Sequence, residues 1–297
     1  VILSVNNSLV CDPILKFGTE EQKEAFLEPL AAGEMLGCFA LTEPEAGSDP
    51  AAIRTTAVRD GDDYILTGNK VFITSGTDAD VAIVFATVDR ELRHKGITAF
   101  IVPADTPGYS HGSHEYKLGV NASGTTELAF AEMRIPVSQR LGEEGAGFKV
   151  AMSALDGGRL GIASQAVGIA QGAFEEALEY SAQREQFGRP IGEFQAIQFY
   201  LADMSTEIDA ARLLTWKAAW AKGSGRRFSL EAAQAKLFAS EMAQRVTSKA
   251  LQIHGGYGYI REYNVERYFR DARIAEIYEG TSEIQKMVIS NWVLQNT

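Results

Sequence analysis

The sequence predicts an α+β protein of several domains: a partial helical region at the amino terminus, an antiparallel β-sandwich or barrel in the middle, and a carboxy-terminal four-helix bundle. Short β-type apolar runs and turn sequences fill residues 35–141, and no helix-length segment lies between them. After residue 147, long segments rich in Ala, Leu and Glu follow a helical period almost to the end of the chain. We therefore expect domains at 1–34, 35–147 and 148–297.

The first 34 residues have a helical pattern. An apolar stretch covers residues 1–10, and Thr19-Glu20-Glu21-Gln22 has the form of a capping box that opens a helix. Gly33 is the expected end of that helix.

The middle region contains five short apolar runs, at 64–66, 70–74, 81–88, 97–102 and 126–130. Tight-turn sequences separate them, including Asp60-Gly61-Asp62-Asp63 and Gly68-Asn69. A parallel βαβ sheet is disfavoured because such a sheet needs a helix between successive strands.

The carboxy-terminal half predicts four long helices, near 148–183, 193–223, 229–253 and 282–294, separated by glycine-containing breaks. In the second of them a helical spacing of apolar side chains predicts one buried face, made by Leu201, Met204, Ile208, Ala211 and Trp216.

Composition and missing motifs exclude several classes of protein. The formal net charge of −11 over 297 residues argues against a general affinity for nucleic acid. The longest β-type apolar run is far shorter than the roughly 20 residues of a membrane span. Two cysteines are too few for a disulfide framework and favour a reducing, cytoplasm-like compartment. The sequence lacks three common motifs: G-x-G-x-x-G between a strand and a helix, G-x-S-x-G, and a phosphate-binding loop ending in Lys-Ser or Lys-Thr. A metal site is not expected, because His111 and His114 have no further metal ligand nearby.

Six segments carry polar or charged groups that suit a bound ligand: residues 39–49, 70–76, 155–159, 183–195, 252–259 and 270–283. Taken singly, each also has an ordinary structural explanation, such as a capped turn, a strand end or a link between helices. In the third segment we expect Arg159 to be a fixed cation at the start of a helix.

Glu279 is the most informative single residue. It follows the apolar pair Ile277-Tyr278 and precedes Gly280, so we expect its carboxylate to project from a sharp bend into a partly dehydrated cavity. Such a site raises the pKa of a carboxyl group toward working pH, as a general base requires. Thr281 and Ser282 are expected to cap the helix that follows.

In this order, the six segments resemble the acyl-CoA dehydrogenase family, and most closely its short-chain, butyryl-CoA branch. The most specific matches are 271–283, 252–256 and Thr42-Glu43-Pro44 with Gly47-Ser48. The resemblance covers essentially the whole chain and implies the same three-part fold, with the family's opening helices missing before Val1.

The resemblance also implies FAD, held without the dinucleotide fingerprint, between the middle domain and the bundle and across a subunit interface. The flavin side would be contacted by Phe39, Leu41, Thr42, Gly47, Ser48, Phe72, Ile73 and Thr74. The pyrophosphate and adenine end would be bound by Arg184, Phe187, Gln195, Gln252, Ile253, Gly255 and Gly256, with Thr281, Ser282 and Glu283 completing the site. Phe72 departs from the Trp that much of the family carries.

For the substrate, the resemblance implies acyl-CoA contacts from Ser48, Asp156, Gly157, Gly158, Arg159 and Gly280, with Arg159 as the cation for the CoA part. Glu279 would remove the α-proton of the thioester while the β-hydrogen leaves as hydride to the flavin, giving a trans-2-enoyl-CoA. Some branches place the base at the position of Gly158, where they carry Glu; Gly158 cannot act, so Glu279 is the consistent choice.

By the same resemblance we expect a role in fatty acid β-oxidation, a homotetramer built as a dimer of dimers, an electron-transfer flavoprotein as electron acceptor, and a cytoplasmic or mitochondrial-matrix location. Two alternatives stay open: an acyl-CoA oxidase, in which oxygen reoxidises the flavin, and a flavin-binding relative that is not a dehydrogenase.

Overall fold

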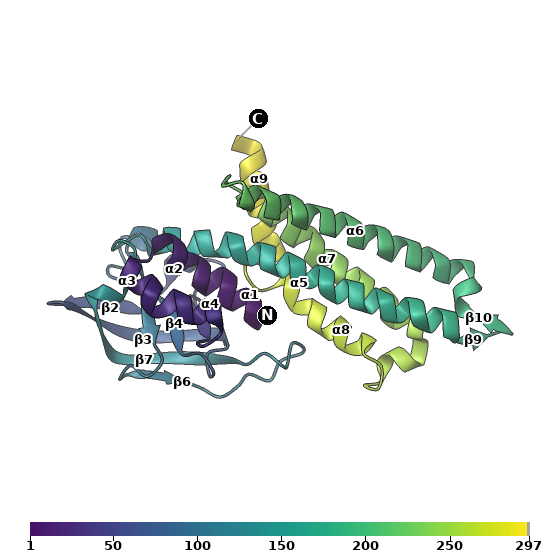
Figure 1. The fold of residues 1–297 in the computed structure, drawn as a ribbon, viewed down its shortest axis with the longest axis horizontal. Coiled ribbons are helices and arrows are strands. Elements are labelled where there is room, and N and C mark those ends of the chain that lie inside the picture. The colour runs from purple at the N-terminus through teal and green to yellow at the C-terminus, as the bar shows by residue number, and fades with distance from the viewer. Residues whose placement is uncertain (296–297) are drawn as a thin grey trace. The chain divides into compact units, whose positions relative to one another are not determined.

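The computed structural model describes residues 1–295. The chain divides into two compact units (Figure 1). Unit 1 contains residues 1–117 and 121–158, and unit 2 contains residues 118–120 and the chain from Arg159 onward. The three-domain division of the sequence stays a prediction.

Unit 1 begins with short helical segments, as the sequence predicts. They are α1 (Ile2–Ser4), α2 (Asp12–Phe17), α3 (Glu20–Gln22) and α4 (Glu28–Ala32), with π-helical turns at Val5–Cys11 and Lys23–Leu27. Thr19 caps α3 in a full capping box: its hydroxyl accepts from the Gln22 backbone N–H at 3.2 Å, and the Gln22 side chain accepts from the Thr19 N–H at 3.1 Å. Gly33 ends α4 with a left-handed φ of 77°.

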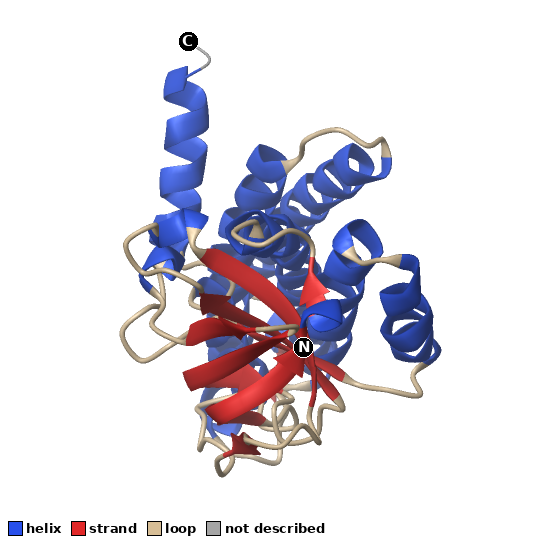
Figure 2. Cartoon of the chain, turned by 90° about the vertical axis from the view of Figure 1, so that its left-hand side faces the viewer, coloured by secondary structure: helices blue, strands red, loops and turns tan. Residues whose placement is uncertain are grey.

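The rest of unit 1 is a β-sheet, whose strands fan out side by side in Figure 2. Its strands are β1 (Gly37–Ala40), β2 (Thr56–Asp60), β3 (Asp63–Thr74), β4 (Val81–Thr87), β5 (Ile97–Pro103), β6 (Tyr109–His111), β7 (Thr125–Pro136) and β8 (Arg140–Leu141). Within the described residues the order is β6-β7-β3-β2-β4-β5-β8, with β1 also paired to β4. Most pairs are antiparallel, as expected, but β1 and β2 each run parallel to β4.

Both faces of β4 are buried, which explains its unbroken apolar sequence. Val81, Ile83 and Phe85 belong to a core with side chains of the amino-terminal helices and the first turns of α5 (Gly147–Gln183). The alternate side chains, from Ala82 to Ala86, join a second core with Tyr64 and Phe100. The sheet is therefore covered on this face by segments distant in sequence.

Unit 2 is helical. The four predicted long helices are present: α5, whose first turns belong to unit 1, α6 (Gln195–Gly223), α7 (Ser229–His254) and α9 (Ser282–Gln295). The helices α5, α6 and α7 run alongside one another in Figure 1. A fifth helix, α8 (Val265–Ala272), was not predicted. Its buried residues are Val265 and Ala272, at its two ends. Its eight residues are too few for a clear helical period.

Short elements link the long helices. Strands β9 (Glu185–Gln186) and β10 (Arg189–Pro190) form a small hairpin between α5 and α6, and 3-10 turns cover Ile191–Glu193, Gly255–Tyr259 and Arg273–Glu276. In unit 1 similar turns cover Pro50–Ala52, Arg93–Lys95 and Val137–Gln139.

The predicted buried face of α6 is partly wrong. Met204, Ile208 and Ala211 are buried in the bundle core, whereas Trp216 is 61% exposed. After Ala211 the buried face continues at Thr215 and Ala218, which keep the 3.6-residue spacing, so position 216 lies off that face. Among the described helices, none has the length and apolar character needed to cross a membrane.

Candidate active site

Glu279 lies at a sharp bend between the 3-10 turn at Arg273–Glu276 and α9, as the sequence predicts. Its φ is 52° and that of Gly280 is 91°, so two successive residues are left-handed. For a glutamate this conformation is unfavourable and persists only when surrounding contacts enforce it. A Cβ at position 280 would lie 2.7 Å from the Gln285 Nε2, so the bend requires glycine there.

Two buried side chains hold the bend by its carbonyl groups. Lys236 on α7 donates to the Gly280 carbonyl oxygen at 2.8 Å, and Gln285 on α9 donates to the same oxygen at 2.8 Å. Gln285 also donates to the Glu279 carbonyl at 3.3 Å. The Thr281 hydroxyl accepts from the Ile284 N–H at 3.4 Å, which is the helix cap expected for α9.

The Glu279 carboxylate is buried, and neither of its oxygens has a hydrogen-bond partner within residues 1–295. Burial raises the pKa of Glu279 from 4.5 to about 7, against the positive charges of Lys236 and Arg159, which lower it. Such a group changes protonation near neutral pH, which is the property that a general base needs. The geometry therefore provides the dehydrated carboxylate that the sequence predicts.

The segment 156–159 differs from the prediction. We expected Arg159 at the start of a helix, but α5 continues through Asp156, Gly157, Gly158 and Arg159 without a break. Two adjacent glycines lower helix propensity without ending a helix whose neighbouring turns are held by buried side chains. Arg159 is only 6% exposed, and its positive charge acts on Glu279.

A hollow of about 540 Å³ in unit 2 gathers four of the predicted cofactor residues: Arg184, Ile253, Gly255 and Gly256. Nothing lies within 4 Å of a Cβ built on either glycine, so the backbone there is open to a ligand. The Arg184 guanidinium lies 5.4 Å from the centre of the Tyr257 ring, which also lines the hollow. Gln195 and Gln252 are exposed at the start of α6 and near the end of α7.

A left-handed backbone conformation occurs at three of the predicted site residues: Phe72, Phe187 and Glu279. Phe187 is 94% exposed with a φ of 55°, and Phe72 is 67% exposed with a φ of 58°. Seven non-glycine residues have positive φ within 1–295, and these three were all predicted as site residues. Backbone strain concentrates at functional sites, and exposed aromatic rings are costly unless they meet a partner.

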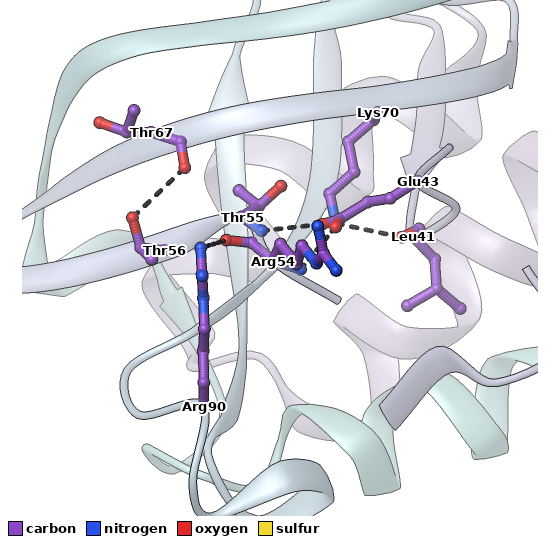
Figure 3. Close-up of polar contacts among 8 residues, drawn as sticks. All are labelled: Leu41, Glu43, Arg54, Thr55, Thr56, Thr67, Lys70 and Arg90. Carbon is purple, nitrogen blue, oxygen red and sulfur yellow. Dashed lines mark hydrogen bonds and ion pairs between the residues drawn. The ribbon is translucent and has the colours of Figure 1, made fainter. Parts of the chain in front are cut away.

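The remaining predicted residues lie in unit 1, where a buried ion pair joins their two segments (Figure 3). Lys70 on β3 donates to the Leu41 carbonyl at 3.0 Å and to the Glu43 carboxylate at 2.8 Å. Glu43 also accepts from the N–H groups of Arg54 at 2.5 Å and Thr55 at 3.0 Å. The Val71 N–H donates to the Thr42 carbonyl at 2.9 Å, so residues 41–43 are tied to the strand that carries Phe72, Ile73 and Thr74.

Both members of this pair are almost fully buried, and each has a shifted pKa. Burial lowers the pKa of Lys70 to about 8 against the attraction of Glu43. For Glu43, burial raises the pKa, but the Lys70 charge and the hydrogen bonds outweigh burial and hold it below its ordinary value. The pair brings together the loop of Leu41 and Thr42 and the end of β3. Phe39 is half-buried on β1, and Gly47 and Ser48 are exposed in the turn that follows.

Sequence reasoning missed the role of Lys236, Gln285 and the Lys70–Glu43 pair. For Lys236 a signal exists: it is the one charged residue in the run from Ala232 to Ala239, whose alanines are buried. A lysine on an apolar helix face must find a buried partner, but the sequence does not identify that partner as a backbone carbonyl 44 residues away.

The residues present fit a bound dinucleotide such as FAD. The Ser282 hydroxyl and the Gln285 Oε1 are buried and lack a hydrogen-bond partner within the described chain. Buried polar atoms are normally satisfied, so these atoms suit polar groups of a ligand. The hollow with Arg184 supplies a cation for a phosphate group. Unit 2 thus contains a dehydrated carboxylate, which suits proton transfer, and a hollow with a cation, which suits an anionic cofactor.

Comparison with known proteins identifies the family. Three family models match: the acyl-CoA dehydrogenase N-terminal domain over residues 1–34, the middle domain over 38–133 and the C-terminal domain over 145–294. The mitochondrial short-chain specific acyl-CoA dehydrogenase of Bos taurus is 54% identical over 296 residues, which is 100% of this chain and 72% of that protein.

Two solved structures are similarly close. The butyryl-CoA dehydrogenase of Megasphaera elsdenii aligns with a TM-score of 0.98 and 52% identity, covering 99% of this chain and 77% of its own. A chain from a structure of the electron transferring flavoprotein of Acidaminococcus fermentans also aligns with a TM-score of 0.98, at 51% identity, covering 99% of this chain and 77% of its own.

The chain belongs to the acyl-CoA dehydrogenase family. It is therefore an oxidoreductase whose cofactor is FAD, and the α+β fold predicted from the sequence is the fold of this family.

Proposed function

We propose that the protein dehydrogenates a short, straight-chain acyl-CoA to a trans-2-enoyl-CoA, with Glu279 as the base. The single observation that carries this proposal is the buried Glu279 carboxylate, which has a pKa near 7 and no hydrogen-bond partner in residues 1–295. The short chain length is supported by the relatives, which include short-chain and butyryl-CoA dehydrogenases at 52–54% identity.

Glu279 would remove the α-proton of the thioester, which is weakly acidic and needs a positioned carboxylate. Its dehydrated setting favours the neutral product of that transfer, so the proton is accepted readily near neutral pH. The backbone N–H of Glu279 would donate to the thioester oxygen, where negative charge develops as the proton leaves. FAD held by the residues assigned below would supply the acceptor for the β-hydrogen, which would leave as hydride.

We assign the cofactor-binding residues as the sequence predicts. In unit 1 these are Phe39, Leu41, Thr42, Gly47, Ser48, Phe72, Ile73 and Thr74, of which residues 41 and 42 are tied to β3 through Lys70 and Val71. In unit 2 they are Arg184, Phe187, Gln195, Gln252, Ile253, Gly255, Gly256, Thr281, Ser282 and Glu283. For the acyl-CoA we assign Ser48, Asp156, Gly157, Gly158, Arg159 and Gly280; buried Arg159 is the cation for the CoA part.

We further propose an electron-transfer flavoprotein as electron acceptor, supported by the similarity to a chain in the Acidaminococcus structure. A homotetramer is proposed from the family resemblance alone. A cytoplasmic or mitochondrial-matrix location is supported by the two free cysteines and by the mitochondrial relatives. The mass of the native protein in solution tests the tetramer.

The decisive experiment is an anaerobic titration of the FAD-loaded protein with acyl-CoAs of increasing chain length. Butyryl-CoA is expected to bleach the flavin absorbance, and longer chains are expected to bleach it less efficiently. If no straight-chain acyl-CoA bleaches the flavin, the proposed activity is wrong. Turnover with an artificial acceptor under argon and in air separates a dehydrogenase from an acyl-CoA oxidase, because only the oxidase gains rate from oxygen.

A further inference from the structure

Lys236 is a buried lysine without a carboxylate at hydrogen-bond distance. It lies on α7 with 0% exposure, and its ammonium group donates to the Gly280 carbonyl at 2.8 Å. Burying an ammonium group costs free energy, and burial lowers the pKa of Lys236 to about 8. A methionine of similar length would occupy the same buried space without this cost. The lysine therefore needs an explanation beyond packing.

The position of Lys236 supplies that explanation. Its bonded carbonyl belongs to Gly280, the residue that makes the left-handed bend beside Glu279. The ammonium also acts electrostatically on the Glu279 carboxylate, which lacks any hydrogen bond to protein within residues 1–295. One side chain thus contacts the backbone of the bend and supplies charge to the base.

We propose that Lys236 is a positioning residue for the reaction: its ammonium fixes the Gly280 carbonyl, which orients Glu279, and its charge keeps the Glu279 carboxylate available as the base. This inference rests on the proposed function, because it assigns a role relative to Glu279. Gln285 also holds the Gly280 carbonyl, because it donates to the same oxygen, but it carries no charge and so does not stabilise the Glu279 carboxylate electrostatically.

Other charged groups around Glu279 come from each neighbouring element of unit 2. Arg159 on α5 is the second cation that acts on it. Glu276, from the preceding 3-10 turn, and Glu283 on α9 act on Lys236 and favour its charged form. Tyr278, next to Glu279, is partly buried with a pKa raised by desolvation, and its hydroxyl donates to Gln165 at 2.9 Å, so it stays neutral. Among the described side chains of unit 2, Lys236 and Arg159 are cations that lower the pKa of Glu279, and Lys236 also donates to the backbone of the bend.

The test uses a reaction that reports the base alone. Acetyl-CoA has an α-proton but no β-carbon, so it cannot be desaturated, and Glu279 can only exchange its α-protons with solvent. Exchange in D₂O is followed by mass spectrometry of recovered acetyl-CoA, with FAD-loaded protein, from pH 5.5 to 9. Wild-type exchange is expected to rise with pH as the base loses its proton.

Three variants separate charge from anchoring. For Lys236→Met we expect the midpoint of the pH profile to move up by on the order of one pH unit and the high-pH plateau to fall, because both the charge and the bond are lost. Gln285→Leu is expected to lower the plateau without moving the midpoint. The matched control is Lys249→Met, which removes the same charge from the same helix about 20 Å further along and is expected to change neither; Lys249 pairs with Asp203 and Glu207.

The outcomes are distinct. An unmoved midpoint in a Lys236→Met protein that retains FAD overturns the proposal. If Lys236→Met and Lys236→Gln both fail to fold or to hold FAD, the lysine is a structural residue and the proposal is overturned as well. The proposed function fails differently: Glu279→Gln would then exchange acetyl-CoA protons as fast as the wild type.

Discussion

Replacing Glu279 by glutamine should stabilise the protein while it removes the activity. Burial raises the pKa of Glu279 from 4.5 to about 7, so the folded protein holds a proton there over a pH range in which the unfolded chain has released it. For a group with a raised folded-state pKa, the contribution to stability is fully present below about pH 4.5 and is lost as the pH rises through 7. At pH 8 the wild type therefore holds an ionised, dehydrated carboxylate at a cost.

The size of this cost follows from the two pKa values. A pKa of about 7 in place of 4.5 corresponds to about 3 kcal/mol at pH 8. Glutamine has nearly the same shape and stays neutral, so Glu279→Gln should gain up to that amount at pH 8 and only about 1 kcal/mol at pH 5. For a chain of this size, about 3 kcal/mol raises the unfolding temperature by roughly 5 °C.

The assay is thermal unfolding of the FAD-loaded protein at pH 5, 6.5 and 8, followed by circular dichroism. The control is Glu262→Gln, an exposed glutamate in the loop before α8, which should show no pH-dependent gain. In the same preparations, dehydrogenation of butyryl-CoA at pH 8 should fall by about 10²–10⁴-fold with Glu279→Gln. A stability gain that is absent at pH 8, or equal at all three pH values, would refute the burial argument; unimpaired turnover would remove Glu279 from the mechanism.

Three further predictions follow from the same structure. In the wild type, kcat/KM for butyryl-CoA should fall as the pH is lowered, with a midpoint near 7, because the base must be ionised; a midpoint near 4.5 in initial-rate measurements would contradict the raised pKa. Lys70→Met should lower the free energy of unfolding in urea by about 3–5 kcal/mol, because it leaves the Glu43 carboxylate buried without its cation. The double variant with Glu43→Gln should lose less than the two single changes combined, and simple additivity would show that the pair is not coupled. Gly280→Ala should slow turnover at least about 10-fold with FAD still bound, because a Cβ there meets Gln285 and position 280 must stay left-handed; wild-type turnover would show that the bend tolerates a side chain.

Much of the fold follows from local sequence patterns. The long helices are predicted because their apolar period extends over many turns, and the Thr19 capping box lies within four residues. The errors occur where the outcome depends on distant residues. Trp216 was assigned to the buried face of α6, but that face continues through Thr215 and Ala218, which leaves the indole ring exposed. The parallel pairing of β1 with β4 joins strands about 40 residues apart, which no turn sequence encodes.

In the candidate site, too, local sequence predicted some features correctly and others wrongly. Ile277, Tyr278 and Gly280 around Glu279 predict a bend with a dehydrated carboxylate, and the bend and the raised pKa are both present. The segment at 156–159 reads as a helix start, yet it lies inside α5, because packing along the whole helix outweighs the low propensity of two glycines.

The sequence by itself determined the order of helical and β-rich regions, the resemblance to the acyl-CoA dehydrogenases and the choice of Glu279 as base, because these depend on neighbouring residues and short motifs. Only the tertiary structure decided what holds that base: Lys236 and Gln285 on one carbonyl, and in unit 1 the buried pair of Lys70 and Glu43. The physical reason is that a buried charge must be satisfied by whatever group the fold brings within hydrogen-bond distance, and that group can lie anywhere in the chain.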